Sequence, residues 1–429
     1  MSVKIVRFDR GITQIYLIAI AVVCVAAAWF FIKWNFADLV AYGMDTNQPE
    51  LKVVADLLVS TAPDDPLTHL AAARMYEKTF DPADLAHSLS EYEAAAGLAP
   101  NSFNFWLELG KAYDRSGEDA KAEATFRRTL ELAPNYSVVQ WAFGNSLVRH
   151  RKTEEGFALI AKAAASDPQY SGPAVATALA MFEGDVAGIR RVLGDTPETN
   201  AAIVSVMAAQ KKFDDAADAW SKLAPEDRRT KFKPIGDKLI EKLAAEKKFQ
   251  LAARVTADMA PDGGEKPATG QVSNGGFESE VKLRNAGLFE WRIAEGQSPQ
   301  IGISEGEKHS GKHSLLIAFN STEVAAFRSV SQTVPVVPGA AYELEIFYRS
   351  DLKSMAALKW EIADAATGTA IVATPAMTIA ADWTSLKAKF TVPSNIDGVV
   401  IRLTREGCGA GSCPANGKVS FDDISIKRL

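Results

Sequence analysis

Three prolines recur at a constant interval in the first half of the chain, and this limits the folds that the chain can adopt. Pro100, Pro134 and Pro168 are 34 residues apart at each step (134 − 100 and 168 − 134). A constant period of about 20 to 50 residues is typical of chains in which one small structural unit is stacked on the next. We therefore predict a stacked array of similar units here, because each such unit buries its apolar face against its neighbours.

The segment between the first two prolines indicates which unit is repeated. Its aromatic and small residues have the spacings of a tetratricopeptide unit, which the segment resembles: Trp106, Leu109, Gly110, Tyr113, Gly117, Ala122 and Phe126. The resemblance implies two antiparallel helices per unit, with Gly110 and Ala122 at their closest approach. Weaker copies of the pattern precede and follow this segment. We therefore predict one all-α solenoid over residues 47–260, with atypical units at its ends as caps.

Solenoids of this kind have a concave inner surface that suits an extended peptide or a helix of a partner protein. Lys111, Arg115 and Asn145 are the polar residues that we expect on this surface. The alternative for each of them is a solvated helix face that binds no partner.

An apolar run near the N-terminus is long enough to cross a membrane as a helix. Within residues 11–32, only Thr13 and Gln14 have side chains more polar than tyrosine. We predict a short cytoplasmic N-terminus at residues 1–10 and a transmembrane anchor at residues 11–33.

The basic residues that flank this run predict its orientation. Lys4, Arg7 and Arg10 precede it, whereas Lys33 stands just beyond it. Because basic residues gather on the cytoplasmic side, we expect a single-pass protein of the cytoplasmic (inner) membrane with its N-terminus inside. The bulk of the chain is then periplasmic or extracellular. The alternative is a cleaved signal peptide, with the small residues 26–28 as the cleavage site.

The helical pattern ends in residues 261–271, a segment rich in glycine, proline and charge that we predict to be a linker. Beyond it, apolar residues recur at every second position, as they do in β-strands. In residues 342–349 one face carries Tyr342, Leu344, Ile346 and Tyr348, and the other carries Glu343, Glu345, Phe347 and Arg349. Turn residues separate several such runs, which predicts an all-β domain over residues 272–429.

Short acidic motifs open and close this domain. Residues 274–278 read Asn-Gly-Gly-Phe-Glu, and residues 421–426 read Phe-Asp-Asp-Ile-Ser-Ile. Together with Trp291 and the segments 311–315, 337–342 and 382–383, they resemble the calcium-binding jelly-roll carbohydrate-binding modules, which share the galactose-binding-like sandwich. The resemblance covers roughly a third of the chain. It implies a jelly-roll sandwich in which the last strand returns beside the first.

Neighbouring first and last strands would bring the carboxylates of Glu278 and Asp422 together, with Asp423 as the fallback for the second. Two carboxylates held close need a cation, and hard oxygen ligands suit Ca²⁺ better than a transition metal. The resemblance places acidic ligands at these positions and implies a structural ion that ties the strands together. The alternative is that Glu278 caps a turn and Asp422 accepts hydrogen bonds from backbone amides.

Sugar binding needs aromatic rings that stack on pyranose faces, with polar side chains around them. The candidate rings are Trp291, Phe347, Trp360 and Trp383. Trp360 alternates in phase with apolar neighbours and Trp383 follows a turn where the resemblance implies a buried aromatic residue, so we expect both in the core. Phe347 shares a predicted strand face with Glu345 and Arg349. We therefore select Phe347, Glu345, Arg349 and Trp291 as candidate ligand-binding residues. The alternative is a solvated outer face with one exposed phenylalanine.

Two cysteines, Cys408 and Cys413, stand five positions apart near the C-terminus. Outside the cytoplasm such a pair is most simply a disulfide that closes a short loop. A zinc site would need two more ligands close by, and no spaced histidine pair lies near this loop. We predict a disulfide between them.

Whole classes of function are disfavoured by what the sequence lacks. A net charge of −6 without a cluster of Lys and Arg argues against nucleic acid as a partner. No nucleophile elbow, phosphate loop or HExxH motif is present, so we expect no enzyme. The chain is then multidomain: a transmembrane helix, an all-α tetratricopeptide solenoid and an all-β jelly-roll sandwich.

These parts predict an envelope scaffold that acts in polysaccharide assembly or export. The solenoid would bind envelope proteins, and the sandwich would bind glycan or polysaccharide, although this step follows from the domain types alone. The alternative is a purely structural protein–protein adaptor whose sandwich binds no sugar.

Overall fold

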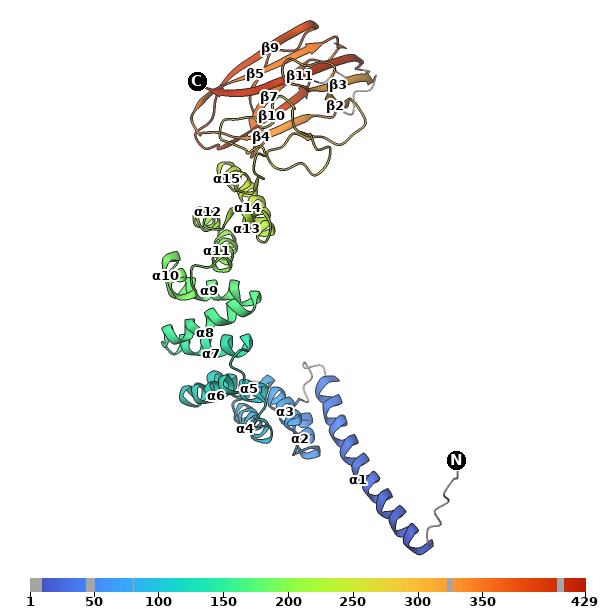
Figure 1. Cartoon of the computed structure of the whole chain (residues 1–429), viewed down its shortest axis with the longest axis vertical. Helices are drawn as coiled ribbons and strands as arrows, with labels where there is room; N and C mark the ends of the chain where they lie inside the picture. The colour runs from blue at the N-terminus through green and yellow to red at the C-terminus, as the bar shows by residue number, and fades with distance from the viewer. Residues whose placement is uncertain (1–9, 44–50, 80, 322–326, 407–412) are drawn as a thin grey trace, which may run out of the picture. The chain divides into compact units, whose positions relative to one another are not determined.

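The computed structural model describes residues 10–43, 51–79, 81–321, 327–406 and 413–429. The chain forms two compact units, Met1–Gly194 and Asp195–Leu429. Helices make up the first unit and the start of the second, and strands make up the rest (Figure 1). The boundary between the units therefore lies inside the helical region and not at the predicted linker.

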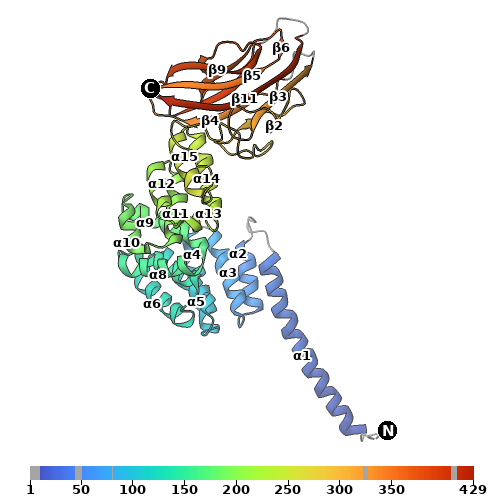
Figure 2. The same ribbon diagram turned by 45° about the horizontal axis from the view of Figure 1, so that its top comes forward.

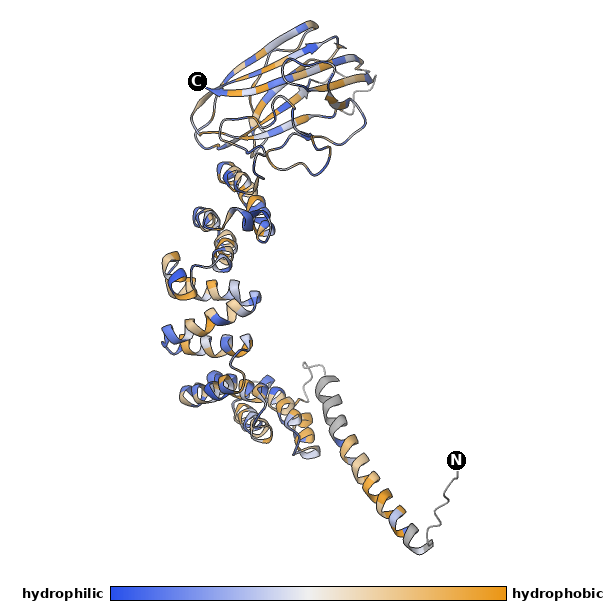
Figure 3. Ribbon diagram, in the orientation of Figure 1, coloured by the Kyte–Doolittle hydropathy of each residue, from blue (hydrophilic) through white to orange (hydrophobic). Residues whose placement is uncertain are grey.

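The first helix, α1 (Arg10–Gly43), contains the apolar run. Its stretch Gln14–Lys33 is long and apolar enough to cross a membrane, and none of it is buried against other described parts of the chain. Figure 3 shows this stretch in orange shades. The predicted anchor at residues 11–33 is thus one continuous apolar helix, while its placement in a membrane stays a prediction.

The rest of the first unit consists of short helices, each packed against the next along most of the array. They are α2 (Leu51–Thr61), α3 (Pro66–Lys78), α4 (Pro82–Leu98), α5 (Phe103–Ser116), α6 (Asp119–Leu132), α7 (Ser137–Arg149), α8 (Thr153–Ser166), the 3₁₀ turn η1 (Pro168–Tyr170), α9 (Ser171–Met181) and α10 (Val186–Leu193). Pro100 precedes α5, Pro134 precedes α7, and Pro168 opens η1. The 34-residue period therefore corresponds to one helix pair, as predicted.

Small residues allow the paired helices to approach closely. A Cβ atom at Gly144 of α7 would lie 2.8 Å from the carbonyl oxygen of Gly156 in α8, and a Cβ atom at Gly156 would lie 2.7 Å from the Gly144 oxygen. One repeat earlier, a Cβ atom at Gly110 would lie 3.0 Å from the ring of Phe126. The prediction that Gly110 lies at a helix contact is confirmed.

The second unit begins with helices that continue the same arrangement: α11 (Pro197–Ala209), α12 (Phe213–Ser221), α13 (Pro225–Arg229), α14 (Lys233–Ala245) and α15 (Phe249–Met259). Helix α11 packs against α12, and α14 packs against α15. The indole of Trp220 is fully buried among them, and a Cβ atom at Gly236 would lie 2.6 Å from its ring. Residues 261–271 contain neither helix nor strand, as expected of a linker.

The strands form two antiparallel sheets that face each other as a sandwich. One sheet has the order β1 (Arg292–Ile293), β4 (Val330–Pro335), β10 (Gly398–Arg405), β7 (Leu358–Asp364), β8 (Ala370–Ala373). The other has the order β2 (Gln300–Ser304), β3 (Ser314–Ser321), β11 (Ala415–Arg428), β5 (Ala341–Ser350), β9 (Ala380–Thr391), with β6 (Lys353–Ser354) paired to β11. Figure 2 shows β3, β11, β5 and β9 side by side.

Alternation along β5 divides its residues as predicted. Tyr342, Leu344, Ile346 and Tyr348 are buried in the sandwich core, whereas Glu343, Glu345, Phe347 and Arg349 lie on the outer face of the β2-β3-β11-β5-β9 sheet.

The last strand of the sandwich also returns to its first segment. The amide of Ile424 in β11 donates a hydrogen bond of 2.9 Å to the carbonyl oxygen of Gly275. The two acidic motifs of the sequence are therefore neighbours.

A joint connects α15 to the sandwich in addition to the linker. The carboxylate of Asp397, before β10, accepts hydrogen bonds from the backbone amides of Phe249 (3.2 Å) and Gln250 (3.3 Å) at the start of α15. The side-chain amide of Gln250 donates to the carbonyl oxygen of Val336 at 2.7 Å. A Cβ atom at Gly398 would lie 2.5 Å from Cγ of Phe249, so only glycine permits this approach.

Candidate functional site

Glu278 holds one side of a short loop, residues 309–313, which we call the anchored loop. Its Oε1 accepts hydrogen bonds from the backbone amides of Lys312 (2.7 Å) and His313 (3.1 Å). These two bonds lower the pKa of the Glu278 carboxyl below its ordinary value. Gly311, which directly precedes these two residues, has a φ of +57°, and a Cβ atom there would overlap the Glu278 carboxylate.

Asp422 of β11 holds the other side of the anchored loop. Its side chain is 0% exposed, and its Oδ2 accepts hydrogen bonds from the amides of His309 (2.8 Å) and Ser310 (3.1 Å). Its Oδ1 accepts from the amide of Asp423 at 2.8 Å. Burial raises the pKa of the Asp422 carboxyl, against the effect of these amides. Asp423 in turn accepts from the ring of His309 (2.7 Å) and the hydroxyl of Ser310 (2.9 Å).

The two predicted metal ligands therefore converge on one loop. A Cβ atom at Gly276 would lie 3.7 Å from Oδ1 of Asp422 and 3.9 Å from Cγ of Glu278, so the first segment and the last strand meet here. Both carboxylates accept backbone N–H groups, which is the alternative role considered for them. Among the residues that the structure describes, no group of three or more His, Cys, Asp or Glu side chains is arranged to hold a metal. Calcium at this place stays a prediction.

Three rings gather where the anchored loop crosses the outer face of the sheet. The imidazole of His309 stacks on the ring of Phe347, with centroids 3.9 Å apart and an interplanar angle of 13°. The centroid of Trp383 lies 5.7 Å from that of His309, at 58°. We call these three residues the aromatic cluster. Because none of them is buried, they present ring surface that a ligand can contact.

The polar residues around the aromatic cluster differ in whether they form ion pairs with neighbouring side chains. Glu345 lies 2.9 Å from the Lys387 ammonium and 3.6 Å from that of Lys427, and the bond to Lys387 lowers the pKa of the Glu345 carboxyl. Arg349 is exposed, two residues beyond Phe347 on the same face. Of the predicted ligand residues, Phe347 and Arg349 thus border one exposed surface, and Glu345 is engaged in ion pairs beside it.

Trp291 and Trp360, by contrast, lie inside the sandwich. Trp291 is 2% exposed, and its ring packs against Phe277 (5.4 Å between centroids) and Trp360 (6.1 Å). Its indole N–H donates to the carbonyl oxygen of Asn274 at 2.9 Å. The position of Trp291 leaves no ring face for a sugar to stack on, and the ring serves instead to hold the opening motif of the sandwich.

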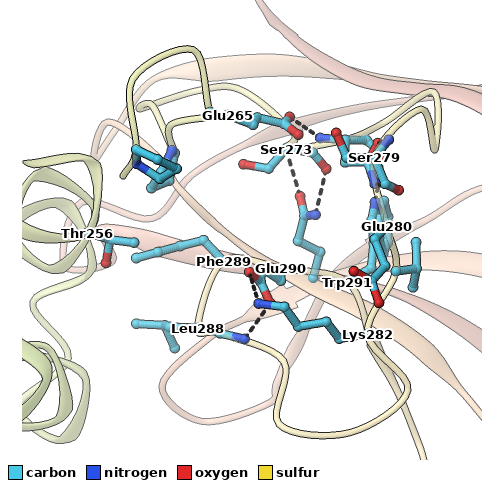
Figure 4. Close-up of a pocket in the computed structure, with 17 residues that line it drawn as sticks. Thr256, Glu265, Ser273, Ser279, Glu280, Lys282, Leu288, Phe289, Glu290 and Trp291 are labelled. Carbon is cyan, nitrogen blue, oxygen red and sulfur yellow. Dashed lines mark hydrogen bonds and ion pairs between the residues drawn. The ribbon is translucent and has the colours of Figure 1, made fainter. Parts of the chain in front are cut away.

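Trp291 also borders a cavity of about 260 Å³ between α15, the linker and the first loops of the sandwich (Figure 4). Its wall is apolar at Leu288 and Phe289 and acidic at Glu265 and Glu280. The cavity is smaller than the ~300 to 1,000 Å³ that is usual for small-molecule sites. The aromatic cluster is therefore the better candidate for a glycan-binding site than this cavity.

The remaining predicted site residues fall outside these places. Lys111 lies 2.9 Å from Glu108, Arg115 donates to Glu77 at 2.7 Å, and Asn145 donates to the Trp141 carbonyl at 2.8 Å, so each is bonded within the array. Cys413 is buried, but Cys408 lies outside the described residues. The disulfide between them stays a prediction.

His309 is absent from the ligand-binding residues that the sequence predicts. It precedes β3, 38 residues before Phe347 (347 − 309), and only the pairing of β5 with β11 brings the two rings together. The one available signal was its place two residues before the segment 311–315, which resembles the family motif. To predict a ligand-binding role for His309, one must know that Asp422 accepts hydrogen bonds from the amides of His309 and Ser310 and so holds the anchored loop over the sheet.

Comparisons with known proteins identify the C-terminal part of the chain. Residues 269–407 match the family model of a carbohydrate binding domain. Among curated proteins, no relative was found.

Several solved structures are similar to parts of the chain. One, described as "CBM4 structure and function", is 15% identical with a TM-score of 0.28, covering 37% of this chain and 99% of that chain. The CBM22-1–GH10 modules of a Clostridium thermocellum xylanase with xylohexaose are 17% identical, with a TM-score of 0.27, covering 38% of this chain and 29% of that one. The pilF protein of Pseudomonas aeruginosa is 15% identical, with a TM-score of 0.34, covering 47% of this chain and 93% of that one.

Proposed function

We propose that this chain is a membrane-anchored scaffold whose sandwich binds glycan at the aromatic cluster and whose helical repeats bind protein partners. The observation that carries the glycan part is the group of His309, which is exposed, with Phe347 and Trp383, which are half-buried, on one sheet face within the carbohydrate-binding domain. Aromatic rings stack on the C–H faces of sugars, and the polar groups beside them bond the hydroxyls.

Glycan-array binding by the purified chain, followed by titration against the best glycans, tests this proposal. Phe347→Ala and Trp383→Ala should each weaken binding about two- to tenfold, because each removes one stacking surface. Met355→Ala is the matched control, since Met355 is 75% exposed and lies outside the aromatic cluster. If no glycan binds, the rival proposal of a purely structural adaptor is favoured. If glycan binds and all three variants bind it like the unaltered chain, the aromatic cluster is not the binding site.

We further propose that α1 anchors the chain in the inner membrane, with residues 34–429 on the periplasmic or extracellular side. Support comes from the apolar stretch Gln14–Lys33 and from the basic residues that precede it. Reporter fusions after Leu429 test the orientation. Activity, after this fusion, of a reporter that works only in the cytoplasm would contradict the proposed orientation.

Calcium is proposed as a structural cofactor at the anchored loop. The carboxylates of Glu278 and Asp422 supply hard oxygen ligands on two sides of that loop, and a cation nearby would offset the cost of burying Asp422 ionised. Main-chain oxygens would have to complete the coordination, because Ca²⁺ takes about six to eight oxygens. The ion would stiffen a loop that the backbone amides already hold.

A role in polysaccharide assembly or export, without catalysis, is the system-level part of the proposal. It joins an anchor, a protein-binding array and a glycan-binding sandwich in one chain. Crosslinking in cells followed by mass spectrometry would test it. We expect crosslinks between the helical repeats and proteins that synthesise or export polysaccharide. If no such protein is crosslinked, this part of the proposal is wrong.

A further inference from the structure

We infer that the glycan recognised at the aromatic cluster is acidic, with Arg349 binding a sugar carboxylate beside the rings. This inference rests on the proposed glycan-binding function. It adds the chemical class of the ligand, which neither the family match nor the fold specifies.

The position of Arg349 is defined by the strand register. It follows Phe347 by two residues on β5, so both side chains lie on the outer face of the sheet, about 7 Å apart along the strand. On the adjacent β9, Thr384 pairs with Tyr348 and Ala380 pairs with Ser350, so Trp383 lies in the irregular stretch of β9 that faces Arg349. A sugar ring stacked on the aromatic cluster would therefore have its substituents within reach of the Arg349 guanidinium.

The charges on this face single out Arg349. The two glutamates of β5 are matched by three lysines, with ion pairs of Glu343 to Lys389 (3.7 Å) and of Glu345 to Lys387 (2.9 Å) and Lys427 (3.6 Å). The side chain of Arg349 forms no hydrogen bond or ion pair with any residue in the described part of the chain. It is thus a cation beside the rings with no described carboxylate within ion-pair distance. The acidic side chain placed on its side of the sheet is Glu307, which accepts a hydrogen bond of 3.1 Å from Ser420, the cross-strand neighbour of Arg349.

The chemistry of the guanidinium makes a carboxylate its best partner. Its planar N–H groups match the two oxygens of a carboxylate, and such paired bonds are stronger than bonds to neutral hydroxyls. The net charge of the whole chain is −6, which repels an acidic polymer at long range. An acidic glycan therefore needs a local cation for binding, and Arg349 provides one at the place where stacking occurs.

The test compares one oligosaccharide in two forms, a uronic-acid oligomer and the same oligomer with its carboxylates reduced to alcohols. Binding to the full-length chain in nanodiscs is measured for both at low and high salt. We expect about three- to tenfold tighter binding of the acidic form at low salt, with the preference shrinking as salt screens the charges. Arg349→Met should abolish the preference, because it should weaken binding of the acidic form about three- to tenfold more than binding of the reduced form.

Lys389→Met is the matched control, because Lys389 is 70% exposed on the same face but is paired with Glu343. It should retain most of the preference for the acidic form. Equal binding of the two forms, or a preference that survives Arg349→Met, would overturn the inference and leave glycan binding intact. Binding of neither form, together with no binding of any glycan on an array, would overturn the proposed function itself.

Discussion

The close approach of α7 and α8 offers a sharp test of the helical array. Replacing Gly144 with alanine adds a Cβ atom 2.8 Å from the carbonyl oxygen of Gly156, 2.8 Å from Cγ1 of Ile160 and 3.1 Å from its backbone nitrogen. Close-packed interiors leave no free space to absorb such contacts. Because two of these atoms belong to the backbone of α8, they cannot move by a side-chain rotation, and the two helices must separate.

The magnitude follows from two opposing effects. Overpacking a well-packed contact costs about 1 to 3 kcal/mol. An alanine in a helix interior is better than glycine by up to about 1 kcal/mol. Since backbone atoms are involved, we take the upper half of the penalty and expect a net loss of about 1 to 2 kcal/mol in the local stability of the pair.

Hydrogen–deuterium exchange measured on peptides from Ser137–Arg149 and Thr153–Ser166 reports this loss directly. A local destabilisation of about 1 to 2 kcal/mol speeds exchange by about 5- to 30-fold. Gly97→Ala in α4 is the matched control, because a Cβ atom there meets no atom within 4 Å. Gly110→Ala should fall between the two, since its Cβ atom meets only the side chain of Phe126.

Unchanged or slower exchange in α7 and α8 after Gly144→Ala would refute this reasoning, because the variant would then behave like Gly97→Ala. Gly156→Ala should speed exchange to a similar extent, as its Cβ atom would lie 2.7 Å from the Gly144 oxygen. The double variant should lose less than the sum of both, since the first separation of the helices makes room for the second Cβ atom.

Four further predictions concern separate contacts. Gly311→Ala should destabilise the sandwich by about 1 to 3 kcal/mol in thermal melting, because the position has a φ of +57° and faces the Glu278 carboxylate. A chelator should lower the melting temperature of the sandwich. Removing calcium from a hundredfold excess over Kd lowers the free energy of unfolding by about 2.7 kcal/mol. Glu278→Gln should blunt that response, and an unchanged melting temperature with no copurified calcium would exclude the ion. The hydrogen bond that the His69 ring donates to the Glu91 carboxylate raises the pKa of His69, so the stabilisation it gives is full below the ordinary pKa of 6.5 and is lost as pH rises through the raised pKa. His69→Gln should flatten that part of a profile of melting temperature against pH, and an unaltered profile would contradict this. Asp397→Ala should speed exchange in α15 and cost about 0.5 to 2 kcal/mol, as loss of a helix cap does, whereas unaltered exchange would mean that the joint is open in solution.

The fold was accessible from the sequence because its signals are local or periodic. The 34-residue proline spacing depends on one helix pair at a time, and the alternation along β5 depends on a single strand. Resemblance supplied the long-range part, namely that the chain returns to its start. The bond between Ile424 and Gly275 confirms that return.

The candidate site was only partly predictable, because its contacts join distant segments. Glu278 and Asp422 were correctly expected to converge, but their hydrogen bonds to the anchored loop depend on where backbone amides point. His309 has no local pattern that marks it as a partner of Phe347. Trp291 and Phe347 belong to the same residue class, and only the packing of the core decides which ring is buried and which is exposed.

The joint between α15 and the sandwich determines how a mechanical load travels along the second unit. The bonds of Asp397 and Gln250 bridge the helix and the sheet directly, in parallel with the covalent path through residues 261–271. Tension applied to the sandwich therefore reaches α15 through these short bonds first. The linker would bear the load only after these hydrogen bonds break. It would then keep the sandwich covalently attached to α15 while the hydrogen bonds form again.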